Sequence, residues 1–129
     1  MQILQPPGWP RPKGYSNGVA AGGRMVFVSG MVGWNADGVF ECDDFAGQAA
    51  QALRNAVAVL AEAGAGPGDI VRMTWYVVDR DEYLGAAKEL GRVYREVIGA
   101  HFPAMSAVAV TALMEARARL EIEVTAMVP

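Results

Sequence analysis

The chain has 129 residues, of which 53% are hydrophobic and 19% charged, and its formal net charge is −3. This length and composition are typical of one globular domain, so we expect a single domain over residues 1–129. An acidic chain without a basic tract lacks the phosphate-neutralising charge that nucleic acid binding needs. No segment approaches the ~20 apolar residues of a membrane helix. We therefore expect a soluble, cytoplasmic protein that binds neither nucleic acid nor membrane.

The N-terminal region is rich in proline and glycine. Residues 1–14 contain four prolines, which remove backbone donors and disfavour helix, so this stretch predicts an extended arm. A short strand is expected over 18–21 and a β-rich strand over 24–30. Gly22 and Gly23 lie between these strands and predict a hairpin.

A long helix is expected next. Residues 34–40 hold Asn, Asp and Gly, which favour a loop or hairpin. Asp43 or Asp44 is a suitable N-cap, and apolar residues recur at helical spacing from Phe45 onward. Gly64 and the Gly-Pro-Gly that follows predict the end of this helix.

The second half predicts a strand, a helix and two further strands. Residues 69–79 are β-branched and aromatic, and Asp79 or Asp81 can cap a helix whose apolar stripe runs over 83–98. Strands are expected over 105–113 and 117–127, and the second of these alternates strictly between apolar and polar residues.

The predicted order is β-β-α-β-α-β-β, an α+β domain with a mixed sheet and two helices on one face. The opposite face then carries either Met73 and Trp75 or Arg72, Thr74 and Tyr76, depending on register. A half-apolar face without a cover is a candidate oligomer interface.

Several kinds of chemistry lack the residues they need. Cys42 is the single cysteine and His101 the single histidine, which excludes an intrachain disulfide and disfavours zinc binding. No glycine-rich loop joins a strand to a following helix, as a nucleotide site requires. Cys42 precedes an expected helix N-terminus, a position that can activate a thiol, but an ordinary structural cysteine is the simpler interpretation. We expect no metal and no cofactor.

Two carboxylates on one strand face are the more informative candidates. Glu121 and Glu123 share the polar face of the last strand with Arg117 and Arg119. Three interpretations of these groups are open: a solvated face, ion pairs between them, or a cationic site for an anionic ligand. They gain functional meaning only where the face borders a cleft.

Five short segments form a recognisable series along the chain: Tyr15–Val19 (YSNGV), Val26–Gly30 (VFVSG), Gln51–Gly64 (QALRNAVAVLAEAG), Phe102–Ala104 (FPA) and Leu120–Glu123 (LEIE). In this order they resemble the segments of the RidA/YjgF family of reactive-intermediate deaminases. The resemblance covers nearly the whole chain, from about residue 13 to 127.

The resemblance implies a chorismate-mutase-like fold and a homotrimer with a small ligand in each intersubunit cleft. It implies hydrolysis of enamines or imines such as 2-aminoacrylate, which releases ammonia without a cofactor. In that pattern Glu121 orients or deprotonates water, and backbone N–H groups near Gly30 and Ala107 hold the substrate carboxylate. Tyr15 forms part of the wall.

The sequence departs from the family pattern at two positions. The family's deaminases carry an arginine after the Pro-Ala pair, where this chain has Met105, and the asparagine of the second helix aligns with Lys88. Three interpretations remain open: an imine hydrolase with an altered substrate range, a non-catalytic ligand-binding trimer, and an RNA-directed translation inhibitor or ribonuclease.

Overall fold

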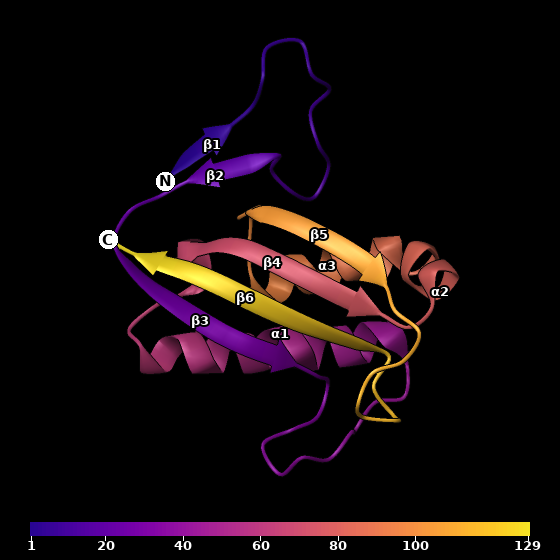
Figure 1. Ribbon diagram of the computed structural model, residues 1–129. Helices are drawn as coiled ribbons and strands as arrows, with labels where there is room; N and C mark the ends of the chain where they lie inside the picture. Colours follow the sequence, from indigo (N-terminus) through magenta and orange to yellow (C-terminus); the bar gives the residue numbers. More distant parts are fainter.

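The computed structural model describes residues 1–129 as a four-stranded sheet with its helices on one side and a two-stranded ribbon at the N-terminus (Figure 1). The elements in chain order are β1 (Gln2–Leu4), β2 (Gly18–Ala20), β3 (Arg24–Met31), α1 (Phe45–Glu62), a 3₁₀ turn (Pro67–Asp69), β4 (Ile70–Val77), α2 (Arg80–Gly85), α3 (Ala87–Val97), β5 (Ala104–Ala109) and β6 (Leu120–Val128). The sheet order is β3-β6-β4-β5, in which β4 and β5 are parallel and the other pairs antiparallel. The predicted mixed α+β architecture is confirmed.

The core lies between the sheet and the helices. The parallel pair β4–β5 requires a crossover, which α2 and α3 provide. Leu53 and Leu60 of α1 are fully buried against the sheet, as are Met73 of β4 and Ile122 of β6. Burial of each such side chain contributes about 1.5–3 kcal/mol, so this layer is the main source of stability.

The alternation of β6 decides which residues face the helices. Leu120, Ile122, Val124 and Ala126 are buried, as their alternation predicts. Their β4 counterparts on the buried side are Met73 and Trp75, so Arg72, Thr74 and Tyr76 point away from the helices. The sheet therefore has one covered face and one open face.

The structure shows which of the candidate aspartates cap the first two helices. The Asp44 side chain, not that of Asp43, accepts a hydrogen bond from Gly47 N (2.9 Å) and caps α1. Asp79 caps α2 in the same way. The predicted second helix is divided at Ala86, whose ψ of 6° interrupts the helical path directly after Gly85.

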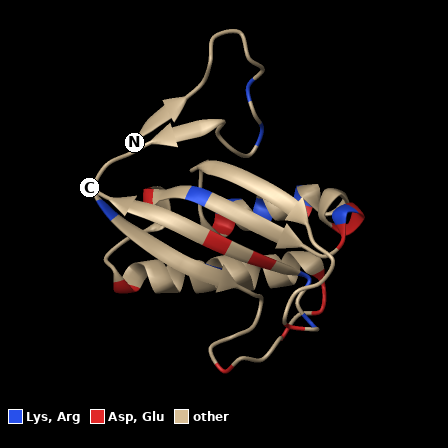
Figure 2. Cartoon of the chain, in the orientation of Figure 1, with Lys and Arg blue, Asp and Glu red and all other residues tan.

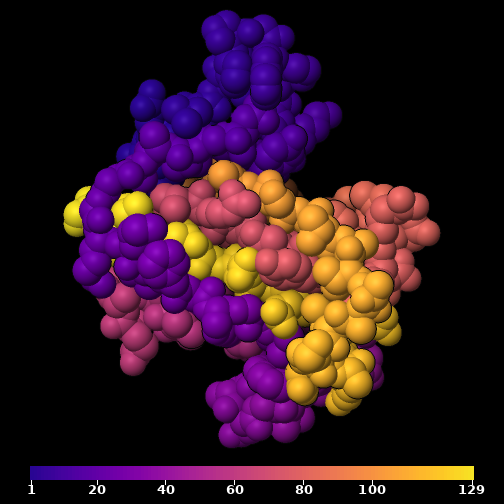
Figure 3. All heavy atoms as spheres, viewed as in Figure 1, coloured from indigo at the N-terminus to yellow at the C-terminus, as the bar shows by residue number.

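The predicted hairpin at Gly22–Gly23 is wrong. Strand β2 pairs with β1 and does not pair with β3, so the extended arm contains a strand of its own. Gly23 has φ +129°, and a Cβ there would lie 2.1 Å from the Val128 carbonyl oxygen. At this glycine the chain passes the end of β6 and enters the sheet as β3. The arm that precedes it projects beyond the rest of the molecule (Figure 3).

The last two strands are shorter than predicted. Strand β5 ends at Ala109 and β6 begins at Leu120. Between them Arg117 pairs with Asp43, and Arg119 bonds to the Asp43 carbonyl, which draws this segment toward the start of α1. No helix of the structure combines the length and hydropathy that a membrane span requires.

Candidate functional site

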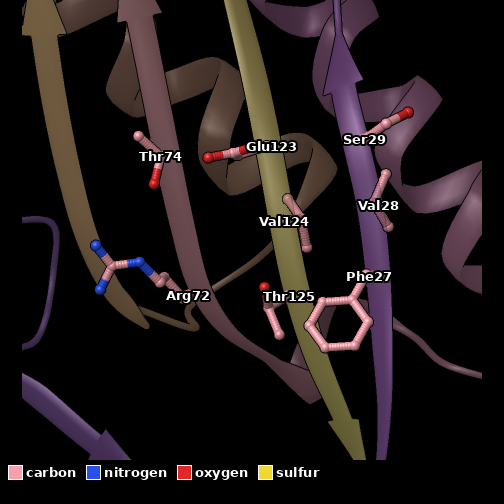
Figure 4. Close-up of a pocket in the computed structure, with 8 residues that line it drawn as sticks. All are labelled: Phe27, Val28, Ser29, Arg72, Thr74, Glu123, Val124 and Thr125. Atoms are coloured by element: carbon pink, nitrogen blue, oxygen red, sulfur yellow. The ribbon is translucent and has the colours of Figure 1, made fainter.

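The open sheet face carries a shallow hollow of about 450 Å³. Figure 4 shows the side chains around it, which come from β3, β4 and β6. Its lining includes Phe27, Ser29, Arg72, Thr74, Glu123 and Thr125. The acidic positions of β6 lie beside a basic position on β4 in the middle of this face (Figure 2).

The polar groups of the open face are partly engaged with one another. The Tyr76 hydroxyl donates to Glu123 Oε1 at 2.6 Å, and this hydrogen bond raises the pKa of Tyr76 above its ordinary value. Phe27 and Met25 on β3 are 69% and 52% exposed. An apolar edge next to a polar centre is typical of a surface that a partner covers.

Glu121 and Gly30 lie in direct contact on this same face. The pairing of β3 with β6 shifts register between Val28 and Met31, and Gly30 lies within that irregularity. A Cβ built on Gly30 would be 2.1 Å from Glu121 Oε2. Glycine is therefore required for this carboxylate position, and the tyrosine of the open face donates to Glu123 rather than to Glu121.

A second hollow of about 370 Å³ lies on the helix side, along the free edge of β5. We call it the edge groove. The N-terminal arm contributes Tyr15, β5 contributes Met105, and Trp75, Tyr83 and residues of α3 complete the lining. Ser16 attaches the arm here, because its backbone N donates to Pro103 O (3.0 Å) and its hydroxyl to Phe102 O (2.5 Å).

The predicted site residues fall into two groups on opposite faces. Met105 pairs with Met73, whose side chain is buried against the helices, so Met105 faces the edge groove. Glu121 pairs with Tyr76 on the open face. One chain therefore brings Glu121 together with Gly30, and Tyr15 together with Met105, but it does not unite the two groups.

Two further candidates occupy exposed positions. Ala107 lies on the edge strand β5. Lys88 lies on α3 and is not among the residues that line the edge groove of the single chain. The cationic residues that do line the groove are Lys13 and Arg95.

The remaining chemistry-bearing side chains have structural partners. His101 Nε2 lies 2.7 Å from the Ile70 carbonyl oxygen, so this nitrogen carries the proton and donates. Arg119 Nη1 pairs with Glu82 Oε2 at 2.9 Å rather than with Glu121 or Glu123. Cys42 is a free, half-buried thiol. The structure gathers no group of three or more His, Cys, Asp or Glu side chains suited to a metal ion.

The aromatic lining of the edge groove was not predicted. Trp75, Tyr83 and Tyr94 come from three different elements, and their spacing along the chain matches that of ordinary core residues. The available signal was the pair Ala87 and Gly91 on α3. Two small residues four positions apart leave space on one helix face.

These observations define a small α+β domain whose mixed sheet has helices on one face and an open face with a polar centre on the other (Figure 1). Residues 10–128 match the family model described as Endoribonuclease L-PSP. The structure superposes on YyfB of Yersinia pestis, a protein of the Rid family, with a TM-score of 0.87 and 32% identity over 98% of each chain.

Relatives of named families agree with this match. A RutC family protein of Haemophilus influenzae is 36% identical over 106 residues, which cover 81% of this chain and 80% of that protein. The human 2-iminobutanoate/2-iminopropanoate deaminase is 29% identical over 105 residues, or 81% of this chain and 73% of that protein. The chain belongs to the RidA/YjgF family.

Proposed function

We propose that this protein hydrolyses a small enamine or imine of the 2-imino acid type, with Glu121 as the group that orients and deprotonates water. The observation that carries the proposal is the Glu121 carboxylate held against Gly30, where no side chain separates it from the backbone. The likeness to a human 2-iminobutanoate/2-iminopropanoate deaminase supports the same chemistry.

The proposed reaction needs positioned water more than strong activation, because an imine carbon is already electrophilic. Water oxygen bonds to this carbon, the C=N electron pair moves to nitrogen, and Glu121 accepts the proton of the water. Glu121 returns this proton to nitrogen, which gives a carbinolamine, and then carries the remaining hydroxyl proton to the same nitrogen. The oxygen electron pair forms the C=O bond as the C–N bond breaks, and ammonia leaves with formation of the 2-keto acid. An enamine first takes a proton on its terminal carbon. Acid–base catalysis of this kind contributes about 10²–10⁴-fold.

The complete site requires a second copy of the chain. Glu121 and Gly30 on one sheet face, and Tyr15 and Met105 on the other, meet when neighbouring subunits place their opposite faces together. We propose a homotrimer with three such clefts, each for one small molecule. Backbone N–H groups near Gly30 and Ala107 then hold the substrate carboxylate, and no cofactor takes part.

Met105 alters the expected substrate range. A charge-assisted hydrogen bond contributes about 1.5–3 kcal/mol, so a site without the arginine binds a small imino acid about 10- to 150-fold less tightly. An apolar thioether suits a ligand with an apolar group at that point. The same substitution favours the second candidate, a trimer that binds a small molecule without catalysis.

The RNA-directed interpretation has less support. Although the family description includes endoribonuclease activity, the chain has a net charge of −3. His101, its single histidine, already donates to the Ile70 carbonyl. The chain therefore has no basic stripe that could follow an RNA backbone, and its one imidazole is already engaged and is not placed to take a proton from a ribose hydroxyl.

The direct test generates 2-aminoacrylate from serine with a dehydratase and follows keto-acid release with and without the protein. We expect acceleration that is lost in Glu121→Ala and kept in Glu123→Gln, which retains an acceptor for Tyr76 on the same strand face. Equal rates for wild type and Glu121→Ala would contradict the proposal. No acceleration, together with thermal stabilisation by a small acid, would favour the binding protein.

A further inference from the structure

The edge groove has an aromatic interior that a small imino acid would leave unfilled. Two aromatic pairs form its walls: Trp75 against Tyr83, with ring centroids 6.1 Å apart, and Tyr94 stacked on Phe102 at 5.7 Å. Its volume of about 370 Å³ is within the range of small-molecule pockets. Side chains such as those of 2-aminoacrylate or 2-iminobutanoate hold only one or two carbons and cannot cover this surface.

A buried donor lies in the same wall. Trp75 is 4% exposed, and its Nε1 is buried without a hydrogen-bond partner. Buried indole N–H groups normally have a partner, and one without a partner costs free energy. Trp75 therefore places an unpaired polar group in an otherwise apolar wall of the groove.

The charges of the groove are of one sign. Lys13 and Arg95 line it, no carboxylate does, and neither cation takes part in an ion pair of the structure. A Cβ at Gly91 would be 3.7 Å from Arg95 Nη1, so the guanidinium extends across the helix face that Gly91 leaves open. An apolar pocket with unpaired cations complements an anion that carries an apolar body.

We propose that the edge groove accepts the aromatic side chain of a 2-imino acid, whose carboxylate gains Arg95 or Lys13 as a cationic partner in addition to the backbone N–H groups near Gly30 and Ala107. The catalytic part of this inference rests on the proposed function, and the binding part does not. Met105 takes the place of a cation and extends the apolar wall, while Gly91 leaves room for the ring. The specificity of the site then follows from Gly91, Arg95 and Trp75.

The test measures calorimetric binding of phenylpyruvate and pyruvate, which are 2-keto acids with and without the ring. We expect phenylpyruvate to bind at least about 10-fold more tightly, because burial of the ring removes apolar surface from water. Gly91→Leu should abolish this preference by filling the groove. Gly85→Leu is the matched control, since Gly85 is also helical, has open space around it and lies outside the groove.

Arg95→Gln tests the cation. We expect phenylpyruvate affinity to fall about 10-fold, as for loss of a charge-assisted bond. Arg92→Gln should leave affinity unchanged, because Arg92 lies on the same helix, pairs with Glu96 and does not line the groove. Equal binding of the two keto acids, or a preference that survives Gly91→Leu, would overturn the inference.

Turnover separates this inference from the proposed function. Tight phenylpyruvate binding without hydrolysis of any imine would support the aromatic groove and contradict the hydrolase. Hydrolysis of 2-iminobutanoate, with rejection of the imine derived from phenylalanine, would support the hydrolase and contradict the aromatic groove.

Discussion

The Glu121 side chain on β6 fills the space that a side chain at Gly30 on β3 would need: a Cβ on Gly30 would lie 2.1 Å from Glu121 Oε2, 2.6 Å from its Cδ and 2.8 Å from its Cγ. The absence of one methyl group on β3 therefore fixes the place of the carboxylate on β6. The proposed chemistry depends on this contact, because Glu121 is the group proposed to orient and deprotonate water.

Gly30→Ala should displace the Glu121 side chain and reduce imine turnover at least about 10²-fold, the lower range for loss of a positioned acid–base group. The side chain can rotate away into solvent, so we expect the thermal midpoint to change little. Gly22→Ala is the control, because no atom lies within 4 Å of a Cβ at that position. Full activity in Gly30→Ala would show that the position of Glu121 does not matter.

Met105→Arg should increase turnover of 2-aminoacrylate about 10- to 150-fold, because a guanidinium can form a charge-assisted bond with the substrate carboxylate. The gain should appear mainly in KM, since the contact exists in the ground state as well. Turnover in Met105→Arg that does not exceed that of the wild type would show that the absence of this arginine does not limit activity on 2-aminoacrylate.

Arg119→Ala should lower the free energy of unfolding by about 1–3 kcal/mol, as expected when a partly buried charge loses its partner. Arg119 holds Glu82, whose other carboxylate oxygen is already buried without a partner, and it also bonds to the Asp43 carbonyl. Arg80→Ala provides the comparison: its 3.8 Å pair with Asp81 is fully exposed and should contribute less than about 0.5 kcal/mol. Urea unfolding of both variants measures the difference.

Stability should fall at alkaline pH because of Tyr94. Burial raises the pKa of this phenol well above its ordinary value of 10.0, and its hydroxyl donates to the His101 carbonyl at 2.6 Å. A phenol with a raised folded-state pKa contributes stability that is fully present below the unfolded pKa. That stability is lost as the pH rises from about 10 toward the folded value.

Tyr94→Phe should therefore lower stability at pH 7 by about 1 kcal/mol through the lost hydrogen bond, yet weaken its decline above pH 10. Tyr83, whose pKa burial also raises, should leave a smaller residual slope. Thermal unfolding between pH 7 and 11 tests this, and an unchanged alkaline slope in Tyr94→Phe would exclude Tyr94 as its source.

The sequence predicts the main sheet well because its signals are local. The alternation of Leu120, Ile122 and Val124 and the cap at Asp44 depend on neighbours a few residues away. The predicted hairpin at Gly22–Gly23 is absent because paired glycines indicate a turn without indicating which strands it joins. Strand β2 pairs with β1, and Gly23 lies against the end of β6.

The site could be predicted only in halves. The contact between Gly30 and Glu121 joins two residues 91 positions apart in sequence and depends on a register shift between β3 and β6. Trp75 and Arg95 lie on different elements, 20 residues apart, and only the tertiary fold brings them to one groove. The division between two faces follows from strand register, which no single segment encodes.

The most direct test of the account mixes two variants, each of which is expected to be inactive towards the aromatic imine derived from phenylalanine. Glu121→Ala keeps the edge groove and Gly91→Leu keeps the carboxylate, so unfolding them together and refolding forms mixed assemblies. If each site joins the groove of one subunit to Glu121 of its neighbour, random mixing restores about one quarter of the sites and of the imine hydrolysis rate. A mixture as inactive as its separate components would show that the two halves do not meet across subunits.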